Sequence, residues 1–183
     1  MGYDALNAIM GRYSCRAFTD QMPTDGQFDA IARAALAAPS GMNAQPWHVI
    51  VAKDRALIAD LEAAGLKGLS ELPDRSAYDR IMSRGGTLFY GAPAIVMVAM
   101  RPDSGLDCGI LCENVAIAAE ALSLGSVICG LAGIPFAGAR GEEFKRRFGF
   151  PEGYVFGMSV LIGHPAKPGK PHDLDWSKLS YVG

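Results

Sequence analysis

Residues 38–51, with the sequence APSGMNAQPWHVIV, constrain the chain most, because they combine a helix stop, a polar loop and the start of a strand. Pro39 disfavours helical geometry at the residue before it and has no backbone N–H to donate, so a preceding helix should end here. The apolar run at residues 49–51 predicts a buried strand. The loop between them is therefore held at both ends by regular structure.

The candidate binding residues of this loop are Pro39, Ser40, Gly41, Asn43 and Gln45. The last four offer hydroxyl, amide and backbone groups to a ligand. We expect Gly41 to have access to a positive φ, and the amides can both donate and accept hydrogen bonds. Such a loop can bind the edge of a flat heterocycle. A plain polar turn, with Trp47 packed into the core, explains the same residues without any ligand.

Length and composition indicate one ordinary globular domain, residues 1–183. The chain has 183 residues, of which 50% are hydrophobic and 20% charged, enough for a substantial core. The net charge of −2 gives no electrostatic case for nucleic acid or an anionic membrane as a partner. No apolar run approaches the roughly 20 residues that span a bilayer, and the first residues do not resemble a secretory signal.

Four scattered cysteines favour a reducing, cytoplasmic setting. Cys108 and Cys112 are spaced i, i+4 on a predicted helix and could offer two thiolates to a metal, but small buried thiols are the simpler interpretation. The sequence also lacks the G-x-G-x-x-G, P-loop, G-x-S-x-G and H-E-x-x-H motifs. We therefore predict no metal site and no Rossmann dinucleotide fold.

Hydrophobic periodicity predicts alternating helices and strands along the whole chain. Helices are expected at residues 4–11, 24–36, 54–64, 106–124 and 140–149, and further strands at 89–99, 126–129 and 154–163. Thr24 and Gln27 have the spacing of a capping box. Gly65 and Gly125 are expected to cap the C-termini of two helices. Residues 66–86 are more polar and irregular, as in segments that cover active sites.

A basic pattern follows the first of these helices. Arg12, Ser14 and Arg16 would point to one side of an extended segment, because side chains alternate along a strand. Two guanidinium groups flanking a hydroxyl suit a phosphorylated polyol, since arginine donates two parallel hydrogen bonds to phosphate. A solvated basic strand would show the same three residues.

Two of these motifs together resemble the nitroreductase family. A-P-S-G-x-N-x-Q-P-W at residues 38–47 is similar to the family's most characteristic motif, and R-x-S-x-R at residues 12–16 is similar to its second signature. Members are FMN-dependent NAD(P)H oxidoreductases that act as intertwined homodimers. The resemblance implies an α+β fold, with a mixed, mainly antiparallel central sheet flanked by helices. It covers the chain from its N-terminal region to its C-terminal tail.

The resemblance also assigns roles to the N-terminal motif. It places Arg12 and Ser14 at the phosphate and ribityl end of FMN, and Arg16 near the N1/O2 edge of the ring. Asn43 would bond the polar edge of the ring. The polar loop and the basic motif would thus hold opposite ends of one cofactor.

Further residues are implied by their positions in the family pattern. A main-chain amide at Gly130 or Leu131, beside Gly133, would face flavin N5 and O4, although a plain strand-to-helix turn fits equally. The C-terminal tail, residues 164–183, would supply Lys170 or His172 to the phosphate. Residues 66–86 would form a variable lid or channel.

Arg84 lies at the end of this lid region, near the position where members place a polar or basic group against the flavin. A solvated arginine at this position is an equally good interpretation.

The implied chemistry is hydride transfer from NADH or NADPH through flavin N5 to an electron-poor acceptor such as a nitroaromatic or a quinone. One stacking site used twice predicts ping-pong kinetics, and no catalytic side chain is required because the chemistry belongs to the flavin. Two alternatives stay open: a non-catalytic flavin-binding or redox-responsive protein, and a specialised member of the reductive dehalogenase or flavin-fragmenting type.

Overall fold

The centre of the molecule is a four-stranded antiparallel sheet in the order β1-β2-β4-β3. The computed structural model describes residues 5–183, so the first residue of the predicted helix at 4–11 lies outside it. The strands are β1 (Trp47–Ala52), β2 (Ala94–Met100), β3 (Gly125–Cys129) and β4 (Val155–Gly163). The predicted α+β fold with a mainly antiparallel sheet is confirmed.

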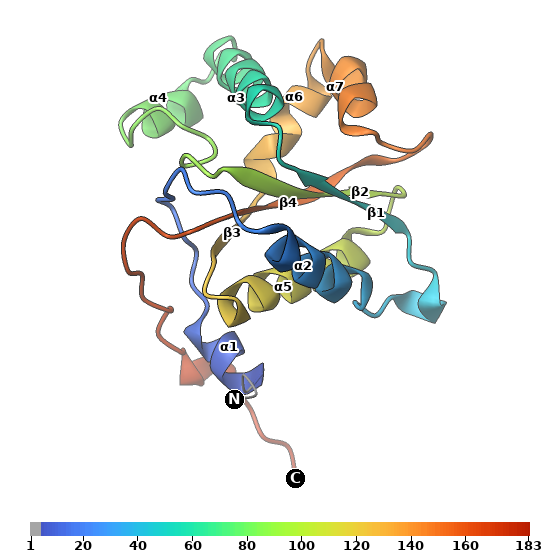
Figure 1. The fold of residues 1–183 in the computed structure, drawn as a ribbon, viewed down its shortest axis with the longest axis vertical. Coiled ribbons are helices and arrows are strands. Elements are labelled where there is room, and N and C mark those ends of the chain that lie inside the picture. Colours follow the sequence, from blue (N-terminus) through green and yellow to red (C-terminus); the bar gives the residue numbers. More distant parts are fainter. Residues whose placement is uncertain (1–4) are drawn as a thin grey trace.

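Helices cover both faces of this sheet, giving three layers (Figure 1). One face carries α3 (Arg55–Ser70), α4 (Ser76–Met82), α6 (Ile134–Ala137) and α7 (Gly141–Phe148). The other face carries α2 (Asp25–Leu36) and α5 (Gly105–Ala121), with α1 (Ala5–Gly11) packed beyond α5. Three short 3-10 helices, η1 (Gly41–Asn43), η2 (Gly130–Gly133) and η3 (Trp176–Lys178), complete the described elements.

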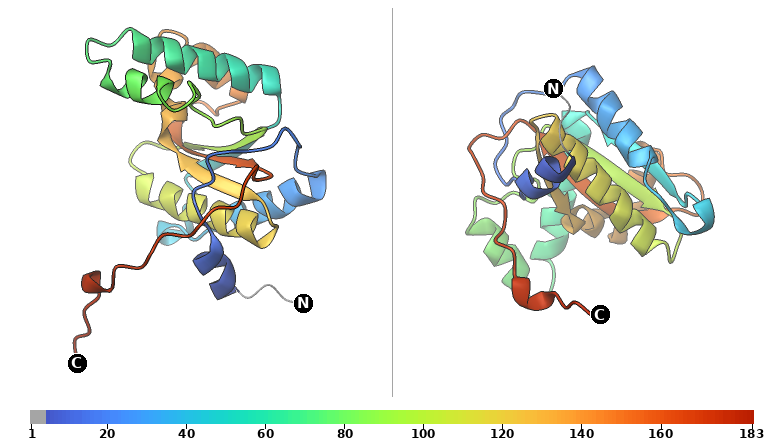
Figure 2. Two further views of the ribbon diagram at one scale, coloured as in Figure 1. Left: turned by 90° about the vertical axis from the view of Figure 1, so that its left-hand side faces the viewer. Right: turned by 90° about the horizontal axis from the view of Figure 1, so that it is seen from below.

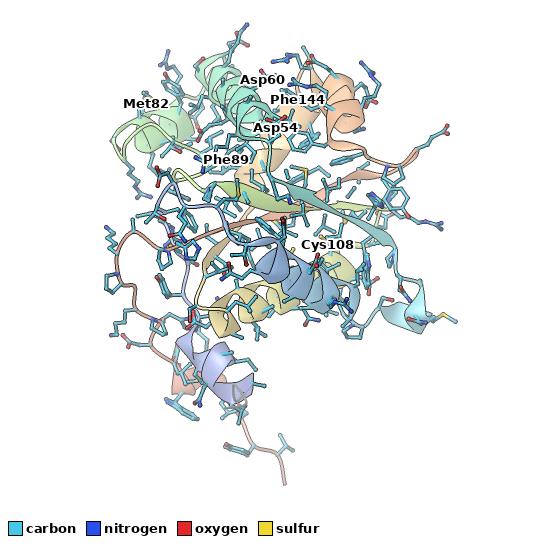
Figure 3. All side chains as sticks on the ribbon, in the orientation of Figure 1. Asp54, Asp60, Met82, Phe89, Cys108 and Phe144 are labelled. Atoms are coloured by element: carbon cyan, nitrogen blue, oxygen red, sulfur yellow. The ribbon has the colours of Figure 1, made fainter. Side chains whose placement is uncertain are left out.

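Burial of the sheet on both sides explains the unbroken apolar sequence of β2. Ile95 and Met97 pack into the core under α3 and α7, whereas Val96 and Val98 pack into the core under α2 and α5. Alternating side chains of one strand therefore serve two separate cores. Figure 3 shows Phe89 and Phe144 on the α3 and α7 side, with Cys108 on the opposite side of the sheet.

Two predicted helix ends are wrong for tertiary reasons. Gly65 lies inside α3, which continues to Ser70. A Cβ at this position would lie 2.7 Å from Leu88 Cδ1, so the glycine serves close packing. Gly125 is the first residue of β3, and the left-handed turn before it falls on Ser123, with φ of 57°.

The region at residues 66–86 is more regular than its composition suggests, because it contains the end of α3 and all of α4. The predicted strand at 89–99 begins only at Ala94, since Tyr90 and Gly91 take positive φ values in a turn before Pro93. All four cysteines are buried and free, and no group of three or more His, Cys, Asp or Glu side chains within residues 5–183 could hold a metal ion. No helix in this range has the length and apolarity to traverse a bilayer.

The capping box at the start of α2 is confirmed and gives a test of the fold. Gln27 N–H donates to Thr24 Oγ1, and Thr24 N–H donates to Gln27 Oε1. Thr24→Ala should lower the free energy of unfolding by about 1 kcal/mol, whereas Thr24→Ser keeps the hydroxyl and should stay near wild type. Urea unfolding of the two variants measures this difference. Equal stability of both variants would show that the cap contributes nothing.

Candidate functional site

The N-terminal basic motif lies along the edge of the sheet, beside β3. Ser14 forms a parallel bridge with Ser126, and the Cys15 N–H donates to the Ser126 carbonyl at 2.8 Å. Further along the same strand, Ile128 remains 41% exposed. The motif thus covers the first half of this edge, and the exposed second half leads into η2.

Arg12 is held from two directions. Its N–H donates to the Ala8 carbonyl at 3.1 Å, which continues α1, and its Nε donates to Glu113 Oε1 of α5 at 2.8 Å. Within residues 5–183 its two terminal nitrogens make no hydrogen bond. The ion pair therefore fixes the guanidinium group and leaves its two terminal nitrogens available to a ligand.

The C-terminal tail returns to the basic motif and forms a small cavity with it. The Ala166 N–H donates to the Ala17 carbonyl at 2.9 Å, and Phe18 forms an antiparallel bridge with Pro165. Beyond these contacts lies a cavity of about 180 Å³, lined by residues 13–17 and 167–170. Figure 2 shows the tail leaving the body of the molecule after this contact.

Three cations line the cavity: Arg16, Lys167 and Lys170. Lys170 also forms an exposed ion pair with Asp173 at 3.0 Å. Lys167 was missed by the sequence analysis, although it lies in the same proline-rich stretch, while the predicted His172 is not part of the lining. Arg12 lies outside the lining as well. The cavity has the donor set expected for a phosphate group.

η2 continues directly from β3, and a buried hydrogen bond holds the residue before it. Ser159, which is fully buried, donates its hydroxyl to the Cys129 carbonyl at 2.6 Å. Burial raises the pKa of the Cys129 thiol, so it stays neutral. A Cβ on Gly133 would lie 2.9 Å from the Phe156 ring, so this glycine is required for packing. Gly130 is exposed at the end of the strand.

The cavity and η2 lie along one edge of the molecule. Gly130 lies four positions after Ser126, the residue that pairs with the basic motif. At about 3.3 Å per residue this is roughly 13 Å. An elongated ligand with an anionic end and a ring could therefore lie along this edge and contact both parts.

The polar loop is organised by its own hydrogen bonds. Gln45 N–H donates to Ser40 Oγ at 2.9 Å, Gln45 Nε2 donates to Asn43 Oδ1 at 3.0 Å, and Gly41 N–H donates to Asp107 Oδ1 at 3.0 Å. Gly41 does not use its access to a positive φ. Instead Met42, Asn43 and Gln45 have φ values of 52°, 54° and 45°. Such conformations are typical of functional loops.

This loop lies far from the cavity in the same chain. Its contact on α5 is Asp107 in the first turn, whereas Gly11, next to the basic motif, lies against Glu120 in the last turn. Thirteen residues of helix at 1.5 Å each separate the two contacts by about 20 Å. Figure 1 shows the loop and the N-terminal segment on opposite sides of α5.

Arg84 follows α4 and is exposed. Its backbone N–H donates to the Ile81 carbonyl at 3.0 Å, but its side chain makes no hydrogen bond within residues 5–183. Its predicted role near a flavin stays a prediction.

Comparison with known proteins identifies the family. A family model described as the nitroreductase family matches residues 9–164, so the protein belongs to the nitroreductase family. This confirms the resemblance drawn from the two sequence motifs.

Individual relatives agree with this assignment. A crystal structure of a nitroreductase with bound FMN from Desulfitobacterium hafniense is 49% identical, with a TM-score of 0.96 over 100% of both chains. A Methanothermobacter thermautotrophicus protein, provisionally named NADH dehydrogenase/NAD(P)H nitroreductase, is 30% identical over 93% of this chain and 82% of its own length. The Bacillus subtilis FMN reductase [NAD(P)H] is 27% identical over 89% of this chain and 66% of its own.

Proposed function

We propose that this protein is an FMN-dependent oxidoreductase that takes hydride from NADH or NADPH and passes it to an electron-poor small molecule, such as a nitroaromatic or a quinone. The observation that carries the proposal is the edge beside β3, where a cationic cavity includes Ser14, the bridge partner of Ser126, and the exposed Gly130 follows about 13 Å further along the strand. The FMN bound in the Desulfitobacterium hafniense relative supports the cofactor, and the name of the Bacillus subtilis relative supports the reductant.

The residues of the cavity fit the anionic end of FMN. Its phosphate carries close to two negative charges, and Arg16, Lys167 and Lys170 supply cations around a space of about 180 Å³. The Ser14 hydroxyl can bond a phosphate or ribityl oxygen. Arg12 lies two residues before Ser14, and its two terminal nitrogens add positive charge to the same end of the site.

The other end of the site would hold the flavin ring. Gly130 is exposed there and directly follows the Cys129 carbonyl, which Ser159 holds in place, so its backbone can approach the ring closely. The bound flavin would supply hydride acceptance and hydride donation, so the protein has only to bind, orient and polarise. Cationic groups near the N1 side of the ring would favour the accumulation of negative charge there. Arg16, which the resemblance places at this edge, lines the cavity together with Lys167 and Lys170, so we assign it to the phosphate end.

We infer that the polar loop acts on the site of a second copy of the chain. Along α5, the contact of the polar loop lies about 20 Å from the contact of Gly11 beside the basic motif, so in this proposal Asn43 bonds the ring that the other subunit holds. Exposed apolar side chains lie on α1, on α5 and in the tail: Ile9, Met10, Leu106, Trp176 and Tyr181. Such surfaces mark protein–protein contacts, and a two-fold homodimer would give two identical shared sites.

The four free, buried cysteines are consistent with a reducing, cytoplasmic setting for this activity.

The purified protein should be yellow and release FMN on heat denaturation. With NADH or NADPH it should oxidise the nicotinamide at a rate that depends on an added nitroaromatic or quinone. An absorption spectrum and an acceptor panel measure both properties. Protein that binds FMN but never oxidises NAD(P)H would instead indicate a flavin-binding module, and colourless protein that stays unchanged with FMN would contradict the whole proposal.

The phosphate assignment is tested by the two lysines of the cavity. Lys167→Ala combined with Lys170→Ala should reduce the preference for FMN over riboflavin by roughly tenfold or more, because charge-assisted hydrogen bonds to the phosphate are lost. Lys178→Ala, another exposed tail lysine, should leave this ratio unchanged. Titration of the apoprotein with each flavin gives the two dissociation constants. A ratio equal to that of wild type would place the phosphate elsewhere.

A further inference from the structure

The tail is in unusually close contact with the basic motif at one point, where Gly169 lies against the ring of Tyr13. A Cβ built on Gly169 would lie 1.9 Å from Cε2, 2.1 Å from Cδ2 and 2.5 Å from Cζ of Tyr13. Such distances are impossible for real atoms, so no other amino acid fits here without displacing the tail or the ring. Gly169 does not have a positive φ. The requirement for glycine is therefore steric and comes from the tyrosine.

The contact involves both the ring and the hydroxyl of the tyrosine. Burial raises the pKa of the Tyr13 phenol, and the Gly169 backbone N–H, close to the phenol oxygen, opposes this rise. Tyr13 itself is placed by its neighbours, because Arg12 is ion-paired to Glu113 and Ser14 is bridged to Ser126. These contacts hold the segment that carries Tyr13, and the tail packs against its ring.

The contact at Gly169 matters because it lies between two lysines that line the cavity. Lys167 lies two residues before Gly169 and Lys170 lies one residue after it, and both line the cavity. The earlier anchor, from Ala166 to Ala17, holds only the start of this stretch. Pro168 and Pro171 restrict the backbone on either side of the glycine, so a shift at Gly169 would move the lysines with it.

We propose that Tyr13 and Gly169 form a steric latch that docks the tail and so positions Lys167 and Lys170 for the phosphate of the cofactor. This inference rests on the proposed function. Tyr13 and Gly169 are positioning residues, since their role is to place the cations rather than to touch the ligand. The latch makes the preference for a phosphorylated flavin depend on a contact between uncharged groups.

Gly169→Ala is the direct test. The added methyl group should push the tail away from the ring, and the preference for FMN over riboflavin should fall about tenfold. The unfolding midpoint should stay close to that of wild type, because the tail is largely exposed. Gly26→Ala is the matched control, since its Cβ would meet nothing within 4 Å, and it should leave the flavin preference unchanged.

A second substitution distinguishes the latch from a general effect on the tail. Tyr13→Ala alone should reduce the FMN preference by a smaller factor, because the tail loses its support but is not expelled. In the Gly169→Ala background the same change should restore the preference to the level of Tyr13→Ala alone, since it makes room for the methyl group. Such non-additivity is the signature of direct contact.

The flavin preferences of these variants distinguish a failure of the latch from a failure of the proposed function. If the double lysine variant loses the FMN preference but Gly169→Ala keeps it, the latch is wrong and the phosphate assignment stands. If the double lysine variant itself keeps the preference, the phosphate assignment fails first. Should Gly169→Ala not fold, Tyr13→Ala carries the test, and an unchanged preference in that variant would overturn the latch.

Discussion

The rigid length of α5 is the constraint on which the rest of the account depends. One end of this helix holds the polar loop through the bond between Gly41 and Asp107, and its other end lies against α1 and the basic motif. A helix cannot shorten, so the contacts of the polar loop and of Gly11, beside the basic motif, stay about 20 Å apart along α5, although the Arg12 side chain reaches back to Glu113. In our proposal both motifs serve one flavin because two chains are combined, and the exposed apolar groups on α1, α5 and the tail offer surfaces for that combination.

Within one chain, the edge strand β3 organises the half-site that is present. The basic motif pairs with the start of β3, η2 follows its end, and the tail packs over the motif. Cations therefore gather at one end and the exposed backbone of Gly130 lies at the other. In our proposal this arrangement separates the binding of the phosphate from the tuning of the ring, which suits a protein whose chemistry is supplied by its cofactor.

The sequence predicted those features whose causes are local. The capping box at Thr24, the apolar strand β2 and the helix stop at Pro39 are set by neighbouring residues. Gly65 and Gly125 were misassigned as caps because contacts far along the chain decide their role. Lys167 was missed for the same reason, since only the fold of the tail brings it beside the basic motif. The separation of the two motifs by α5 likewise has no signal in either motif.

Subunit complementation tests the shared site most directly. Asn43→Ala impairs the loop that one subunit donates, and the double change Lys167→Ala with Lys170→Ala impairs the cavity of the other half-site. Random mixing of the two variants makes about half of the dimers hybrid, and each hybrid has one intact site. NAD(P)H oxidation should then recover to about a quarter of the wild-type rate above the parental background. Mixed protein that is no more active than its parents would show that each chain holds a complete site of its own.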